Sequence, residues 1–169
     1  YPKQNNRLYL VQEFIDGQDL LKEVTHKGKL TELEVYFFLI NLLPVLDFIH
    51  EKNTIHRDIK PENIIRSKNG NLVLIDFGVA KIIKSTMVMG SIAGTVGYSA
   101  PEQMFTGRAF PSSDLYSLAV SAIHLLTGCF PNEDHIYNVM KNQWQWREYC
   151  QQNKIIIDNN LALILDLML

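Results

Sequence analysis

The sequence predicts an α+β fold that is mainly helical, with one short β-hairpin and one strand near the N-terminus. Three observations support this prediction: apolar residues recur at helical spacing in three stretches, an Asn-Gly pair separates two short apolar runs, and an isolated β-prone run lies near residue 10. The chain has 169 residues, 47% of them hydrophobic and 20% charged. This length and balance are typical of a single globular domain.

Composition also excludes several classes of partner and site. The formal net charge is −2, which argues against nucleic acid or an anionic membrane surface as a partner. Cys129 and Cys150 form no CxxC pair and no disulfide framework, so we expect a reducing, cytoplasmic location and no cysteine-built zinc site. The longest apolar stretch, 35–49, is interrupted by polar residues and is shorter than the ~20 residues of a membrane span. We interpret it as a buried helix without membrane contact.

The first two elements follow from local signals. Residues 8–11 are apolar and β-prone and precede Asp16–Gly17, which predicts a strand that ends in a turn. Thr31 and Glu34 have the spacing of a capping box, in which each side chain satisfies a free backbone N–H of the other residue. A helix is therefore predicted from this box to about His50.

The hairpin prediction rests on Asn69–Gly70, which lies between two apolar runs. If these two residues are the centre of the turn, Ile65 faces Leu74 and Asn63 faces Asp76, with each pair on one face of the hairpin. An amide and a carboxylate side by side suit Mg²⁺ that is shared with phosphate oxygens. The alternative is a polar pair that only ends the hairpin.

Beyond the hairpin, residues 77–99 show no sustained period and predict a long loop, a feature that is usually functional in a compact domain. Residues 114–127 return to helical spacing and stop at Gly128, which predicts a helix with a glycine end. An aromatic helical segment is expected at 144–149, and 161–169 is expected to begin a last core helix.

Three motifs carry chemistry. Residues 56–63 read HRDIKPEN, residues 76–78 read DFG and residues 100–102 read APE. In this order they resemble the catalytic core of the protein kinases, and the resemblance covers nearly the whole chain. Lys60 and the GTVGY stretch at 94–98 resemble the serine/threonine branch of that family. Later phrases, DLYSLAV and WQWR, are similar to bacterial and particularly cyanobacterial members.

The resemblance implies transfer of the γ-phosphoryl group of ATP to serine or threonine hydroxyls of protein substrates, with Mg²⁺, or Mn²⁺ in its place. It makes Asp58 the base that accepts the substrate proton and Lys60 the cation that neutralises the transferring phosphoryl group. Asn63 and Asp76 would hold the metal ions. The structural alternative for Asp58 is a surface aspartate in a loop, and that for Lys60 is a solvated lysine.

The resemblance also implies segments with separate roles. They are a hinge at 8–19, a catalytic loop at 56–63, an activation segment at 76–102 and a helical remainder at 103–169. Four residues would contact the nucleotide: Glu13, Ile15, Asp19 and Ile65. Gln12 would lie at the gate of the inner pocket. For Gln12, Asp19 and Ile65 the structural alternative is stronger, because a strand end and a buried isoleucine need no function.

Regulation is implied by Arg57, which in the family pairs with a phosphate on the activation segment and so orders it. The candidate phosphate acceptors are Ser85, Thr86 and Ser91. Thr95 is expected to contact Asp58 and Lys60 instead. Glu102 and Asp114 are implied to be structural, and the usual arginine partner of Glu102 is missing unless Arg147 replaces it.

The sequence departs from the family pattern at its start. No Gly-rich loop, strand lysine or partner helix glutamate precedes Leu8. The sequence starts at Tyr1 and stops at Leu169, which lies inside the apolar run 161–169. We therefore expect a helical C-terminal lobe with its hinge, whose partner, the N-terminal lobe of the same chain, is absent. Such a chain would turn over negligibly by itself.

Two other functions compete with the kinase. A catalytically silent scaffold of the same fold is one, although Asp58, Asn63 and Asp76, the residues that silent members usually lose, are all present. A small-molecule phosphotransferase of related fold is the other. The APE motif at 100–102 and the GTVGY stretch disfavour it.

Overall fold

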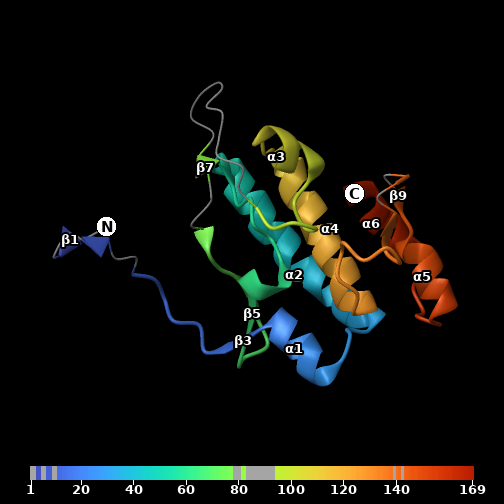
Figure 1. The fold of residues 1–169 in the computed structure, drawn as a ribbon. Coiled ribbons are helices and arrows are strands. Elements are labelled where there is room, and N and C mark those ends of the chain that lie inside the picture. The colour runs from blue at the N-terminus through green and yellow to red at the C-terminus, as the bar shows by residue number, and fades with distance from the viewer. Residues whose placement is uncertain are drawn as a thin grey trace.

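The computed structural model describes residues 3–4, 7–8, 11–77, 81–82, 94–138, 140–141 and 143–169. Two long helices, α2 (Glu32–Glu51) and α4 (Pro111–Thr127), pack against each other at the centre (Figure 1). Around them lie four shorter helices: α1 (Leu20–Lys27), α3 (Pro101–Thr106), α5 (Trp146–Gln152) and α6 (Asn159–Met168). The described chain is thus mainly helical, as predicted.

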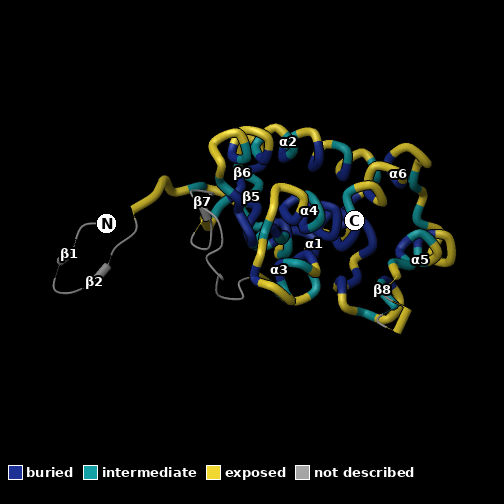
Figure 2. Tube along the Cα trace, turned by 90° about the horizontal axis from the view of Figure 1, so that it is seen from above, coloured by how far each residue is buried: buried dark blue, intermediate teal, exposed yellow. Residues whose placement is uncertain are grey.

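Helix α2 begins at the predicted capping box. The Thr31 N–H donates to Glu34 Oε2 at 2.7 Å, and the Glu34 N–H donates to Thr31 Oγ1 at 3.4 Å. Its inner face is buried in the core: Val35, Phe38, Leu39, Leu42, Leu46 and Ile49. Within the described residues, α2 alone is long and apolar enough to cross a membrane, but a helix whose face lies in a protein core passes the same test. The predicted buried helix is confirmed for that face, and the outer side is exposed (Figure 2).

Helix α4 is buried on nearly every side. It confirms the helix predicted at 114–127, although it begins three residues earlier, at Pro111. Its buried hydroxyls need partners, and each donates to a carbonyl one turn back: Ser117 to Ser113 at 3.0 Å, Ser121 to Ser117 at 2.8 Å and Thr127 to Ile123 at 2.7 Å. The helix ends at Gly128, where φ is 75°, in the left-handed region that glycine adopts without strain.

The C-terminal elements agree in part with the predictions. Helix α6 confirms the predicted last core helix. The aromatic helix begins only at Trp146, because Trp144 lies in a short strand, β9 (Gln143–Trp144), that pairs with β8 (Tyr137–Asn138). Both cysteines are free and buried. The short helices α1 and α3 were not predicted, since each is too short to show a sustained apolar period.

The main sheet has three antiparallel strands in the order β3 (Gly17–Asp19), β5 (Ile64–Ser67) and β6 (Leu72–Leu74). The β5–β6 hairpin was predicted, but its predicted register is wrong by one residue: Ile64, not Ile65, pairs with Leu74. The Ile75 N–H donates to the carbonyl oxygen of Asn63 at 2.9 Å, so Asn63 faces Ile75 and not Asp76.

The turn explains the shift in register. The Gly70 N–H donates to Ser67 O and the Ser67 N–H donates to Asn71 O, both at 2.9 Å, which closes a three-residue loop over 68–70. Only Gly70 has a positive φ, of 87°, whereas the two-residue turn that we predicted needs positive φ at both Asn69 and Gly70.

Of the strand predicted at 8–11, the structure describes only Leu8 and Val11. Leu8 ends β2 (Arg7–Leu8), which pairs with β1 (Lys3–Gln4), and Val11 is outside any strand and 82% exposed. The strand that joins the main sheet is β3, where the predicted turn stood. A Cβ at Gly17 would lie 2.2 Å from the carbonyl oxygen of Arg66, so glycine permits this close approach of the two strands.

The remaining short elements complete the fold. A 3-10 turn, η1 (Pro61–Asn63), precedes β5, and β4 (Thr54–Ile55) pairs with β7 (Lys81–Ile82). Of the predicted long loop, the structure describes only 77, 81–82 and 94–99. Residues 56–63, the predicted catalytic loop, thus lie between β4 and β5 and include η1.

The capping box offers a test of the fold. Thr31→Ala removes the hydroxyl acceptor at the start of α2, and we expect the free energy of unfolding to fall by about 1 kcal/mol. Urea titration followed by circular dichroism measures it. Thr25→Ala is the control, because the Thr25 hydroxyl only donates to the Leu21 carbonyl within α1. Equal losses in both variants would contradict a capping contribution.

Candidate active site

The catalytic loop is anchored by a buried carboxylate in the first turn of α4. Asp114 is 1% exposed; its Oδ1 accepts from the Arg57 N–H at 2.9 Å, and its Oδ2 accepts from the His56 N–H at 2.9 Å. His50 Nε2 of α2 lies 2.8 Å from the same Oδ2. Three donors therefore compensate the cost of burying this charge, and they join both central helices to the start of the loop.

Asp58 lies at the centre of the loop, and each of its carboxylate oxygens is held. Thr95 Oγ1 donates to Asp58 Oδ1 at 2.7 Å, and Asn63 Nδ2 donates to Oδ2 at 3.0 Å. Lys60 Nζ lies 3.5 Å from Oδ2 and donates to Thr95 Oγ1 at 2.8 Å. The structure thus contains the expected contact of Thr95 with both residues. A positioned acceptor beside a cation can accept a proton while charge develops on a neighbouring group.

Asn63 and Asp76 flank the open end of the hairpin. Both bonds of the Asn63 amide to Asp58 use its NH₂ group, at 2.8 Å to the carbonyl oxygen and 3.0 Å to Oδ2, so its Oδ1 is directed away from Asp58. Asp76 is exposed, and its φ of 63° breaks the strand alternation just after the last paired residue. An amide oxygen and a carboxylate are ligands that Mg²⁺ accepts. Within the described residues, no cluster of three or more histidine, cysteine or acidic side chains suits a metal.

His56 connects this end of the hairpin to the loop. Its Nε2 lies 3.0 Å from the Ile75 carbonyl oxygen and its ring packs edge-on against Phe77, with 4.7 Å between ring centroids. Burial lowers the pKa of His56, and this effect is larger than the opposite effects of the Ile75 carbonyl and the nearby carboxylates. A neutral ring that donates from Nε2 leaves Nδ1 to accept from the Asp58 N–H, at 3.3 Å.

The predicted nucleotide residues are only partly brought together. Asp19 and Ile65 are partners in the β3–β5 ladder. Glu13 is exposed and Ile15 is half-buried, both in a segment without regular structure, as is Gln12.

Asp19 also has a structural task at the start of α1. It accepts from the Lys22 N–H at 2.9 Å and pairs with Lys22 Nζ at 2.9 Å. Desolvation raises the pKa of Asp19, but these bonds outweigh it and the net pKa is lowered. These contacts support the structural alternative for Asp19, in which the residue begins α1 and has no part in nucleotide binding.

The regulatory predictions lie mostly beyond what the structure describes. Ser85, Thr86 and Ser91 are outside the described residues. Arg57 is 6% exposed and adopts a φ of 73°, and its Nη2 lies 3.5 Å from the Gly107 carbonyl oxygen.

Glu102 has a partner other than the suggested arginine. It accepts a hydrogen bond from the Ser113 hydroxyl, at the start of α4. Arg147 pairs with Asp166 at 2.6 Å, and the Trp146 Nε1–H donates to the same carboxylate at 2.9 Å. The ion pair of Arg147 therefore ties α5 to α6, and Glu102 ties α3 to α4.

The sequence did not predict the contacts of three buried polar residues, Tyr98, Gln103 and His124. Gln103 Nε2 donates to the Arg57 carbonyl oxygen at 2.6 Å, and Tyr98 OH lies 2.5 Å from His124 Nδ1. Burial lowers the pKa of His124 to about 4. Burial also raises the pKa of Tyr98, and the negative charge of Glu62 adds a smaller effect in the same direction. Their only sequence signal is a polar residue beside the APE motif or inside an apolar helix, which is equally typical of a surface position.

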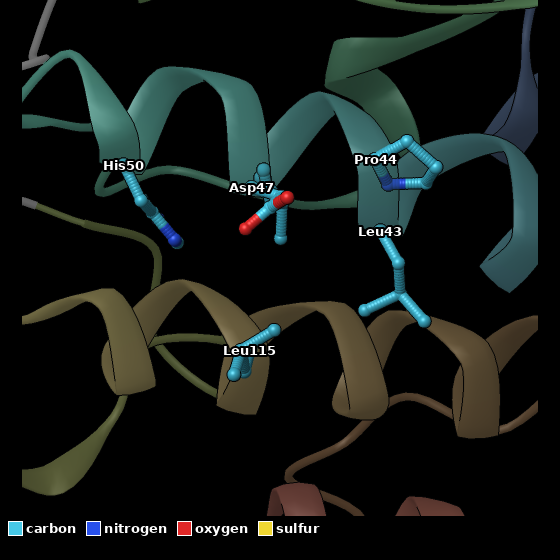
Figure 3. Close-up of a pocket in the computed structure, with 6 residues that line it drawn as sticks. Leu43, Pro44, Asp47, His50 and Leu115 are labelled. Carbon is cyan, nitrogen blue, oxygen red and sulfur yellow. The ribbon is translucent and has the colours of Figure 1, made fainter.

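A groove separates α2 and α4 on the side of His50. It has a volume of about 440 Å³ and is lined by Leu43, Pro44, Leu46, Asp47, His50 and Leu115. Figure 3 shows Asp47 and His50 on α2 above Leu115 on α4. The groove contains none of the predicted catalytic, nucleotide or metal residues. One of its lining residues, His50, contacts Asp114, which anchors the loop at 56–63.

The chain is similar to known protein kinases. The family model of the protein kinase domain matches residues 1–164. Serine/threonine-protein kinase F of Synechocystis sp. is 43% identical over 149 residues, and serine/threonine-protein kinase PknA of Nostoc sp. is 45% identical over 141. These matches cover 86% and 79% of this chain, but only 30% and 25% of the relatives. PrkC of Bacillus subtilis is 34% identical over 76% of this chain and 20% of its own length.

The buried His124 predicts a pH dependence of stability. Its folded pKa of about 4 lies below the ordinary 6.5, so the unfolded state binds more protons between these values and stability falls as pH falls through that range. We expect wild type to lose about 2 kcal/mol more than His124→Gln between about pH 7 and pH 4.5. Urea titration at both pH values measures the difference.

The control for this experiment is His135→Gln, at an exposed histidine. That variant should keep the full pH dependence of wild type. If His124→Gln and His135→Gln lose the same stability on acidification, burial of a neutral His124 is not the cause.

Proposed function

The chain belongs to the protein kinase family, among the bacterial serine/threonine kinases, and we propose that its protein transfers the γ-phosphoryl group of ATP to serine and threonine hydroxyls of protein substrates. The observation that supports this most is the Asp58 carboxylate, bound through Oδ1 to Thr95 and through Oδ2 to Asn63, with the Lys60 ammonium 3.5 Å away. The chain spans about 30% of the length of the first relative that it matches. The activity is therefore proposed for the whole protein.

Asp58 acts as the acceptor of the substrate proton. Thr95 and Asn63 orient its carboxylate, so that a hydroxyl group placed beside it meets an acceptor that need not reorganise. Lys60, held by Thr95, brings a positive charge to the place where charge develops on the phosphoryl oxygens. In this arrangement, one threonine positions both the acceptor and the cation.

Mg²⁺, held by Asn63 Oδ1 and Asp76, would supply charge neutralisation for the phosphates. The NH₂ group of Asn63 also steadies Asp58, so one amide serves both the acceptor and the metal. The nucleotide would lie along β3 and β5, near Asp19 and Ile65, and against the backbone of Glu13 and Ile15.

We further propose that this chain is the C-terminal lobe with its hinge, and that the N-terminal lobe supplies the rest of the nucleotide site. The support is that helices dominate the described residues, and that the sequence contains HRDIKPEN, DFG and APE but no Gly-rich loop before them. The free, buried cysteines fit a reducing cytoplasm, where we place the protein.

The test is Asp58→Asn in the full-length protein, assayed with γ-labelled ATP, Mg²⁺ and a mixed serine/threonine peptide library. Loss of the proton acceptor should lower kcat by about 10²- to 10⁴-fold. Asp47→Asn, at an exposed carboxylate on α2, is the matched control and should keep wild-type activity. Wild-type protein that binds partners but transfers no phosphate would favour the silent scaffold. Equal activity of Asp58→Asn and Asp47→Asn would exclude Asp58 from catalysis.

A further inference from the structure

The turn that presents Asp58 has an unusual backbone. Arg57 is not glycine, yet its φ is 73°, a conformation that persists only where surrounding contacts hold it. Asp114 holds one side of the turn, by accepting from the N–H groups of His56 and Arg57. These bonds leave the next peptide, between Arg57 and Asp58, to be held by other groups.

Gln103 holds that peptide from the opposite side. Its Nε2 donates to the Arg57 carbonyl oxygen at 2.6 Å, and because a carbonyl can only accept, the amide must turn its NH₂ group toward the loop. Gln103 has no exposed surface, so water cannot readily replace this bond. The N–H of the same peptide, that of Asp58, donates to His56 Nδ1 at 3.3 Å. Gln103 and His56 thus fix both polar groups of the peptide that carries Asp58.

The same amide lies against the activation segment. A Cβ at Gly94 would lie 2.4 Å from Gln103 Nε2 and 2.2 Å from Ser99 Oγ, and the φ of Gly94 is 129°. Only glycine therefore lets the segment pass so close to the Gln103 amide. The next residue, Thr95, donates to Asp58 Oδ1. The segment thus reaches Asp58 by two routes, through Thr95 to the carboxylate and through Gln103 to the backbone.

We propose that Gln103 is a positioning residue, which sets the orientation of Asp58 through the Arg57 carbonyl and transmits the placement of residues 94–99 to the catalytic loop. This inference rests on the proposed kinase function, because it assigns Gln103 a part in the same site. Gln103 acts through its bond to the Arg57 carbonyl oxygen. Its contribution is to the geometry of the acceptor.

Gln103→Met tests the proposal, since methionine has nearly the same shape but no donor. In the full-length protein we expect kcat to fall about tenfold while the KM for ATP stays within about twofold, because nucleotide contacts are unchanged. Gln152→Met, the same substitution at the exposed end of α5, is the matched control and should keep both constants. Wild-type kcat in Gln103→Met, or equal changes in kcat and KM, would overturn the proposal.

Gln103→Glu keeps the test decisive if the methionine variant does not fold. The introduced carboxyl group can donate to the Arg57 carbonyl oxygen when it is protonated, whereas the ionised carboxylate repels that oxygen. Activity of Gln103→Glu relative to wild type should therefore rise as pH is lowered, or stay close to wild type if burial keeps the acid protonated throughout. Tenfold lower activity of Gln103→Glu at every pH, without any rise, would contradict a donor role.

Hydrogen exchange separates this inference from the proposed function. In the absence of ATP, exchange of the Asp58 amide should be faster in Gln103→Met than in wild type and unchanged in Gln152→Met. If wild type shows no phosphotransfer but this exchange pattern holds, the kinase function fails and the positioning role of Gln103 in the loop remains. If wild type is active and exchange at Asp58 is the same in both variants, the inference about Gln103 alone is wrong.

Discussion

The arrangement of the site depends on one buried interaction, the Asp114 carboxylate with its three donors. An ionised carboxylate with 1% exposure is tolerated only when its oxygens are compensated, and the His56 N–H, the Arg57 N–H and the His50 ring provide this. Asp114 also lies in the first turn of α4, where the helix dipole favours a negative charge. One carboxylate thereby joins α2, α4 and the catalytic loop.

The polar contacts around Asp58 follow from this anchor. Once Asp114 holds Arg57 at a φ of 73°, the next peptide points its carbonyl at Gln103 and its N–H at the His56 ring. The carboxylate of Asp58 then lies within reach of Thr95 and Asn63. Backbone and side chain of the same residue are thus fixed by separate elements, so that a movement of one element alone changes the geometry of the acceptor.

Two departures from the sequence prediction, the register of the β5–β6 hairpin and the strand at Gly17–Asp19, have a common cause, which is that strands depend on partners. The hairpin turn has φ above zero only at Gly70, and this shifts the pairing by one residue from the register that Asn69–Gly70 predicted. The main sheet also includes Gly17–Asp19, where the sequence predicted a turn, and the glycine there allows close approach to β5. Neither choice can be read from a local pattern.

The sequence by itself determined the elements whose signals are local: the capping box of α2, the glycine end of α4, the last helix and the order of HRDIKPEN, DFG and APE that led to the kinase family. Tertiary structure alone decided which polar side chains meet. Gln103 is far along the chain from Arg57, and His124 from Tyr98, yet each pair is buried and hydrogen-bonded. The physical reason is that spacing encodes helix faces, whereas a contact between distant residues depends on how those faces pack.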